Sequence, residues 1–147
     1  MKVILPTRAY QLIFEHRPNY LYVYVGSEVN NLEIAQSYWF EILSMLHRRG
    51  YSHVLIDKDA PPITAGDAHN LLDQLARAGL GSVTLSLHDR YFDSERCTFE
   101  HLAARDVGLD LAISPTPQEA ETWLLAAAAP IYSTPAHAGS QQHRAAA

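Results

Sequence analysis

The stretch "YLYVYVGSEVNNLEIAQSYWFEILSMLHRRGYSHVLID", residues 20–57, predicts a strand, a helix and a second strand in succession. Its first letters alternate tyrosine with leucine or valine as far as Gly26, which is typical of a strand with two different faces. Apolar residues then recur every three to four positions from Leu32 to Leu46, the period of an amphipathic helix. The apolar run 53–57 predicts the second strand, and strand–helix–strand units of this kind build α/β domains.

Both ends of the helix carry local signals. Asn30 and Glu33 have the spacing of a capping box, in which side chains bond the free backbone N–H groups of the first turn. Basic residues precede Gly50, where they favour the negative end of the helix, and the glycine favours the left-handed turn that ends it. The sequence therefore predicts a helix that starts at Asn30 and stops at Gly50.

The regions on either side extend the pattern. Before it, the β-branched and aromatic runs 10–15 and 20–25 flank a turn with a proline and predict a β-hairpin. After it, helix starts near Thr64, Asp93 and Thr116 alternate with short apolar strands. The predicted fold class is α/β: an N-terminal β-hairpin, then alternating helices and strands, in a mixed sheet whose later strands are parallel.

The length and the end of the chain predict a single domain. A chain of 147 residues suits one hydrophobic core, and no internal repeat is present. The periodic patterns stop before Pro130, and the following residues show neither helical nor strand spacing. We therefore expect a domain over residues 1–129 and a disordered tail over residues 130–147.

The composition narrows the classes of function. The net charge of −5 disfavours nucleic acid as a partner, because binding phosphates requires a clustered basic surface. The single cysteine excludes an intramolecular disulfide, and no apolar run approaches the roughly 20 residues of a membrane-spanning helix. No histidine pair has zinc-site spacing, so we expect neither a metal nor a cofactor. A cytoplasmic location is the expectation.

Three stretches of the chain together resemble a known family. They are residues 20–57, the turn "ITAGDAHNLL" at 63–72, and "FEHLAARDVGLDLAISPTPQEAETWLL" at 99–125. Their order and spacing are similar to those of the SpoIIAA-like (STAS/SEC14-like) small bacterial proteins, over about residues 10–126. The resemblance implies a STAS-type mixed sheet with packed helices and a non-enzymatic role, and some members of this branch look suited to binding an apolar ligand or a membrane.

The same resemblance points to a regulatory turn. In anti-anti-sigma members of the wider group, a serine in an Asp-Ser-Ser-Gly turn is phosphorylated by a partner kinase. Laid over this chain, Gly66 falls on the glycine, Ala65 on the acceptor and Thr64 on the serine before it, so the acceptor itself is missing. The residues alone favour a simpler interpretation, in which Thr64 and Asp67 cap the following helix. A signalling switch centred on Thr64 stays an alternative.

Aromatic and methionine side chains suggest a binding surface. The tyrosines of the strand at 20–25 share one face, and Tyr38 and Met45 lie off the main apolar stripe of the helix. Such groups can line an apolar pocket or a protein contact, with the aromatic pair after "LHDR" as a rim. The candidate ligand-binding residues are Tyr22, Tyr24, Tyr38, Met45, Tyr91 and Phe92.

These features favour a small binding or interaction module over an enzyme. The expected partner is an apolar small molecule or lipid, or another protein, and peripheral membrane contact and a homodimer stay open. A hydrolase is the alternative from another class, because Cys97 and His101 lie four residues apart on a predicted helix and therefore share a face. The simpler interpretation of that pair is a core thiol beside a surface histidine.

Overall fold

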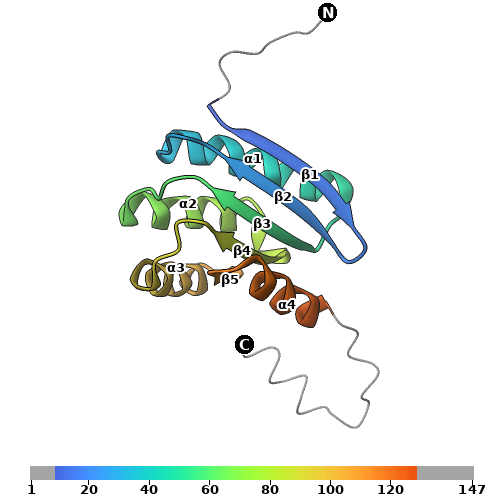
Figure 1. The fold of residues 1–147 in the computed structure, drawn as a ribbon. Coiled ribbons are helices and arrows are strands. Elements are labelled where there is room, and N and C mark those ends of the chain that lie inside the picture. The colour runs from blue at the N-terminus through green and yellow to red at the C-terminus, as the bar shows by residue number, and fades with distance from the viewer. Residues whose placement is uncertain (1–8, 129–147) are drawn as a thin grey trace, which may run out of the picture.

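The structure, a computed structural model, describes residues 9–128 and contains one five-stranded sheet with helices on both faces (Figure 1). The strands are β1 (Gln11–Arg17), β2 (Tyr20–Gly26), β3 (His53–Asp59), β4 (Thr84–Asp89) and β5 (Asp110–Ser114). The helices are α1 (Leu32–Arg49), α2 (Ala65–Arg77), α3 (Ser94–Asp106), α4 (Pro117–Ala128) and the short 3-10 helix η1 (Leu80–Ser82). The tail predicted over 130–147 lies outside the described residues.

The sheet has the strand order β1-β2-β3-β4-β5. β1 and β2 pair antiparallel as a hairpin, and each later strand pairs parallel with the strand before it. The predicted α/β class, with its hairpin, alternating elements and parallel later strands, is therefore confirmed.

The helices form two unequal layers around the sheet (Figure 1). Three successive parallel connections advance in one direction across the sheet, and right-handed crossovers then place α1, α2 and α3 on the same face. α4 follows the last strand and packs on the opposite face, mainly against β3, β4 and β5. On that side, within residues 9–128, much of the β1–β2 hairpin has no helix over it (Figure 1).

The pleat of β2 assigns its residues to two cores. Leu21, Val23 and Val25 are buried against the three-helix layer, in the larger hydrophobic core. Tyr20 points the other way and packs with Leu55 and two residues of α4 in a smaller core. The predicted separation of leucine and valine from tyrosine along this strand is confirmed.

Local signals place most helix ends correctly, with one correction. Gly50 ends α1 with a positive φ of 73°, and Thr64 caps α2 by accepting from the backbone N–H of Asp67 at 3.2 Å. The N-cap of α1, however, is Asn31 and not Asn30. Asn31 Oδ1 accepts from the Ile34 N–H group at 2.8 Å, and this one-residue shift leaves the side chain of Asn30 available for long-range contacts.

Two strands extend further than the sequence indicates. We predicted β3 to end at Asp57 and β4 at Leu87, but β3 continues to Asp59 and β4 to Asp89. The parallel ladder carries both strands on, since Lys58 is the register partner of Asp89. Pairing with a neighbouring strand overrides the low strand propensity of charged residues, and these extensions supply part of the site described next.

Candidate functional site

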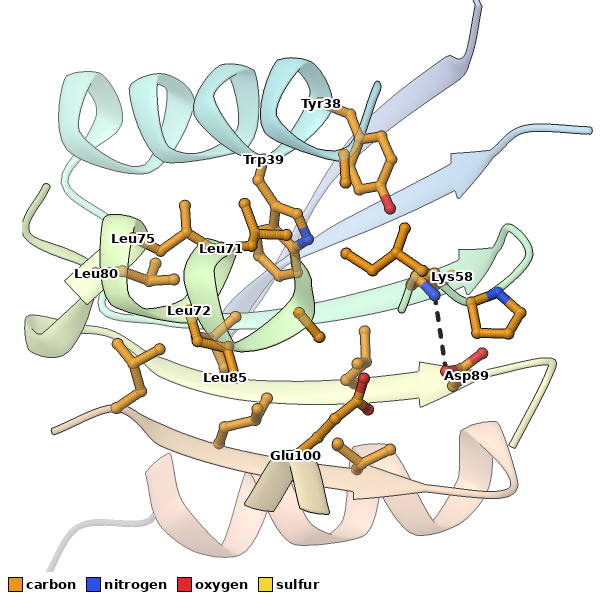
Figure 2. Close-up of a pocket in the computed structure, with 18 of the residues that line it drawn as sticks. Tyr38, Trp39, Lys58, Leu71, Leu72, Leu75, Leu80, Leu85, Asp89 and Glu100 are labelled. Carbon is orange, nitrogen blue, oxygen red and sulfur yellow. Dashed lines mark ion pairs between the residues drawn. The ribbon is translucent and has the colours of Figure 1, made fainter. Parts of the chain in front are cut away.

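An apolar cavity of about 60 Å³ lies between the sheet and the three-helix layer (Figure 2). Its walls come from α1, α2, α3, η1 and the strands β3, β4 and β5 or their flanks. Ala35 of α1 and Ala68 of α2 also line it, and their small side chains leave the space that larger ones would fill. The large apolar lining residues are Trp39, Ile63, Leu71, Leu72, Leu75, Leu80, Leu85, Leu87, Leu109, Leu111 and Ile113.

Polar side chains gather at one end of this pocket, as Figure 2 shows for the labelled members. Lys58 Nζ lies 3.7 Å from Asp89 Oδ2, with both side chains largely buried. Lys58 also donates to the Ala60 carbonyl at 3.3 Å. The set at this end consists of Asn30, Tyr38, Lys58, Asp89 and Glu100.

Asn30 has one satisfied and one unsatisfied amide atom. Its Nδ2 donates to the Tyr38 hydroxyl at 3.1 Å and to the Pro61 carbonyl at 2.9 Å. The Pro61 contact fixes the amide orientation, because a flipped amide would bring two oxygens together. Asn30 Oδ1 is then buried, and no group in residues 9–128 donates a hydrogen bond to it. Buried acceptors are normally paired, so this oxygen marks a place for a donor.

The carboxyl group of Glu100 reaches the same end from α3 (Figure 2). Burial raises the pKa of Glu100, while the ammonium of Lys58 acts in the opposite direction. Burial also raises the pKa of Tyr38 to about 12, so its hydroxyl keeps its proton and can donate. The pocket thus joins an apolar body to an end with unused hydrogen-bonding capacity.

The opposite face of the sheet carries a second polar group of side chains, centred on Asp57. Tyr22 donates its hydroxyl to Asp57 Oδ2 at 2.7 Å, and His88 Nδ1 lies 3.0 Å from Oδ1. Arg90 donates to both carboxylate oxygens, at 3.2 and 3.1 Å. Burial would raise the pKa of Asp57, but the hydrogen bonds from Arg90 and Tyr22 outweigh it and lower the pKa. We call these four residues the Asp57 network.

The other tyrosines of this face are also engaged. Tyr24 donates to Asp59 at 3.3 Å and Tyr20 to Glu121 at 2.7 Å. The guanidinium of Arg17 lies 4.1 Å from the ring centre of Tyr22, within the range of a cation–π contact. Polar groups on this face therefore satisfy one another.

The six predicted binding residues do not converge on one place. Tyr22 and Tyr24 belong to the α4 face, whereas Tyr38 lines the pocket on the other side. Met45 and Phe92 pack at the margin of the larger core without lining the pocket. Tyr91 is exposed and borders a shallow groove that it shares with Tyr24. Of the six predicted residues, Tyr38 is the one that lines the pocket.

Apart from Tyr38, the polar and charged residues at one end of the pocket were not predicted as binding residues from the sequence. Lys58 and Asp89 follow apolar runs of β3 and β4 at the period of two, so extending the alternation by one step would have placed them on the core face. Asn30 was assigned to the helix cap, and Glu100 has no distinguishing signal in the helical pattern.

The turn at residues 64–66 follows Pro62 and Ile63, which line the pocket. Thr64, Ala65 and Gly66 are exposed, and Thr64 Oγ1 serves as the helix cap. The predicted cap is confirmed.

Cys97 and His101 do meet, as their spacing predicts, with Sγ 3.5 Å from Nδ1. His101 Nε2 accepts the backbone N–H of Ile113 at 3.0 Å, so the neutral ring carries its hydrogen on Nδ1 and cannot take the thiol proton there. Burial raises the pKa of Cys97 and lowers the pKa of His101. These features disfavour an activated thiolate.

Comparison with models of protein families and with curated proteins gave no match for this chain. No helix in residues 9–128 is long and apolar enough to cross a membrane. In the same residues no group of three or more His, Cys, Asp and Glu side chains is arranged to hold a metal ion. Fold and site therefore define an α/β domain with an apolar pocket under its three-helix layer.

Proposed function

We propose that this chain is a non-enzymatic binding module that holds a small amphipathic molecule between its sheet and helices α1–α3. The observation that carries the proposal is the pairing of an apolar cavity with a buried, unpartnered acceptor at its polar end. Ligand sites commonly combine an apolar lining with a few placed polar groups that orient the ligand.

The size of the cavity limits the ligand. Since one water needs about 10–15 Å³ of such space, the cavity of about 60 Å³ suits a group of roughly five non-hydrogen atoms. A longer lipid chain exceeds this volume. A compact branched or cyclic apolar group therefore fits this state of the protein better than an extended acyl chain.

The chemistry of the lining supports binding over catalysis. Among residues 9–128, the lining of the pocket includes no serine, cysteine or histidine, which are the most frequent nucleophiles and general bases. The resemblance to SpoIIAA-like proteins favours the same conclusion, because it implies a non-enzymatic role. The single cysteine favours the cytoplasm as the location of this module.

Native mass spectrometry of the freshly purified chain, with a denatured spectrum beside it, tests the proposal. We expect a noncovalent adduct that disappears on denaturation. The Ala68→Leu variant should lose this adduct, because the added carbons occupy the cavity. Ala126→Leu, on the exposed surface of α4, is the matched control and should retain it.

Two other results would redirect the proposal. A bare chain in both spectra, followed by capture of a defined protein partner, would favour a protein-interaction module instead. A covalent phosphate that survives denaturation and maps to Thr64 would favour the signalling switch.

A further inference from the structure

The polar end of the pocket can be divided into groups with partners and groups without. The ammonium of Lys58 forms an ion pair with Asp89 and donates one hydrogen bond, to the Ala60 carbonyl, so it keeps N–H capacity within residues 9–128. Asp89 is used on both oxygens, since Oδ1 accepts from the Tyr91 N–H at 2.9 Å and Oδ2 faces Lys58. The amide nitrogen of Asn30 is used twice. Asp89 and the amide nitrogen of Asn30 therefore have little capacity left for a ligand, whereas Lys58 can still donate.

Two acceptors at this end have no partner in the described part of the chain. Asn30 Oδ1 is buried and receives no hydrogen bond from residues 9–128. The carboxylate of Glu100 makes no hydrogen bond or ion pair within the same residues, although its side chain is half-buried at the pocket. The hydroxyl of Tyr38 serves either kind of ligand, because it can both donate and accept.

The charges at this end of the pocket also favour a ligand head group that donates hydrogen bonds. Lys58 and Asp89 compensate each other, which leaves the charge of Glu100. Arg96, whose Nη1 donates to the Ile63 carbonyl at 2.8 Å, offsets part of the Glu100 charge. A carboxylate head would meet both the Glu100 carboxylate and Asn30 Oδ1, and like charges in a partly buried site repel strongly.

We infer that the pocket selects a ligand with a primary amine head, whose ammonium lies near Glu100 and supplies the donor that Asn30 Oδ1 lacks. The compact apolar part of the ligand then occupies the leucine-lined cavity (Figure 2). This inference rests on the proposed function, because it names the chemistry of the ligand that the proposed module binds.

Three probes test the head group separately from the pocket: isobutylamine, isobutanol and isobutyrate, which share a branched carbon skeleton and differ in charge. Each is titrated into the full-length, ¹⁵N-labelled chain near neutral pH, and amide shifts of pocket residues report binding. We expect the amine to bind most tightly, about fivefold above the alcohol, and the carboxylate least.

Two variants locate the source of the preference. Glu100→Gln should reduce amine binding to about the level of alcohol binding, because it keeps the shape of the side chain and removes its charge. Glu95→Gln is the matched control, since Glu95 is exposed on the same helix.

The outcomes separate the two proposals. Binding of isobutyrate as tight as that of isobutylamine would overturn the amine inference and leave the pocket as a binding site. Undiminished amine binding to Glu100→Gln would also overturn it. If none of the three probes shifts the pocket residues, the proposed function fails as well.

Discussion

The two faces of the sheet differ in how their buried polar groups are hydrogen-bonded. On the α4 face, the carboxylate of Asp57 receives hydrogen bonds from Tyr22 and Arg90 and contacts His88. On the three-helix face, Asn30 Oδ1 has no donor within residues 9–128. The Asp57 network resembles a catalytic cluster in composition, yet its members satisfy one another. Unused polar capacity beside a cavity is the better indication of a ligand.

A single step along each strand separates the two arrangements. Asp57 pairs with His88 in the parallel register, and Lys58 pairs with Asp89. Consecutive residues of a strand point to opposite faces, so the first pair joins the Asp57 network and the second enters the pocket. The same ladder therefore builds a structural network on one side and a candidate ligand site on the other.

Removing the centre of the Asp57 network should have the largest effect on stability. Asp57→Ala leaves Tyr22 and His88 without their acceptor, and we expect a loss of about 3 kcal/mol in the free energy of unfolding. Urea denaturation measures this loss. Asp59→Ala is the control and should cost less than about 1 kcal/mol, because that side chain is 38% exposed. Equal losses for the two variants would show that the network does not stabilise the fold.

Enlarging a buried alanine should have opposite effects on stability on the face with the cavity and on the closely packed α4 face. Ala120→Leu enlarges a fully buried residue of α4 against Tyr20 and Leu55, and we expect a loss of about 1–3 kcal/mol. Ala68→Leu extends into the cavity instead and should raise stability by up to about 1 kcal/mol. Thermal melts of both variants test the contrast, which a similar destabilisation by Ala68→Leu would contradict.

Removing one tyrosine hydroxyl from each face should give a smaller difference in the free energy of unfolding. Tyr22→Phe removes a donor to Asp57, and we expect a loss of about 1 kcal/mol. Tyr38→Phe should cost less, because Asn30 Nδ2 keeps its bond to the Pro61 carbonyl. Urea denaturation of both variants provides the comparison. A larger loss for Tyr38→Phe would mean that its hydroxyl has a stabilising role at the pocket.

The dependence of folding stability on pH should have opposite signs for Asp57 on one face and Glu100 on the other. The contribution of Glu100 should be the smallest of the predicted changes. Because the pKa of Asp57 is lowered in the folded state, its carboxylate stabilises the fold above about pH 3.9, the pKa in the unfolded chain. This stabilisation is lost as the pH falls through the folded-state pKa. The raised pKa of Glu100 favours the folded state below about pH 4.3, and this advantage is lost as the pH rises through the folded value.

Glu100→Gln should therefore gain stability relative to the unmodified chain as the pH rises from about 4.3. Thermal melts between acidic and neutral pH measure the difference, with Glu95→Gln as the control. A difference that stays constant across this range would contradict the assignment of the titration to Glu100.

Local signals allowed the order and the ends of the elements to be predicted. Gly50, Thr64 and Thr116 act through contacts within about one helical turn, so their roles can be predicted from neighbouring residues. The correction from Asn30 to Asn31 shows the limit, because both neighbours have the same side chain and the helix geometry selects between them.

The members of the site depend on contacts between distant parts of the chain. Tyr38 was predicted as a binding residue, but Tyr22 and Tyr24 lie across the sheet from it. Lys58 and Asp89 become neighbours because β3 and β4 pair in one particular register. No spacing in the sequence predicts that register.

The sequence by itself determined the α/β class, the succession of strands and helices, and the division of β2 into an aliphatic and a tyrosine face. Hydrophobic period and helix caps are local properties, which explains why they are visible without a structure. Only the tertiary structure decided which polar groups are paired and which are left at the cavity. Hydrogen bonds act over about 3 Å, so strand register and helix packing decide whether Asn30, Asp57 and Glu100 find partners.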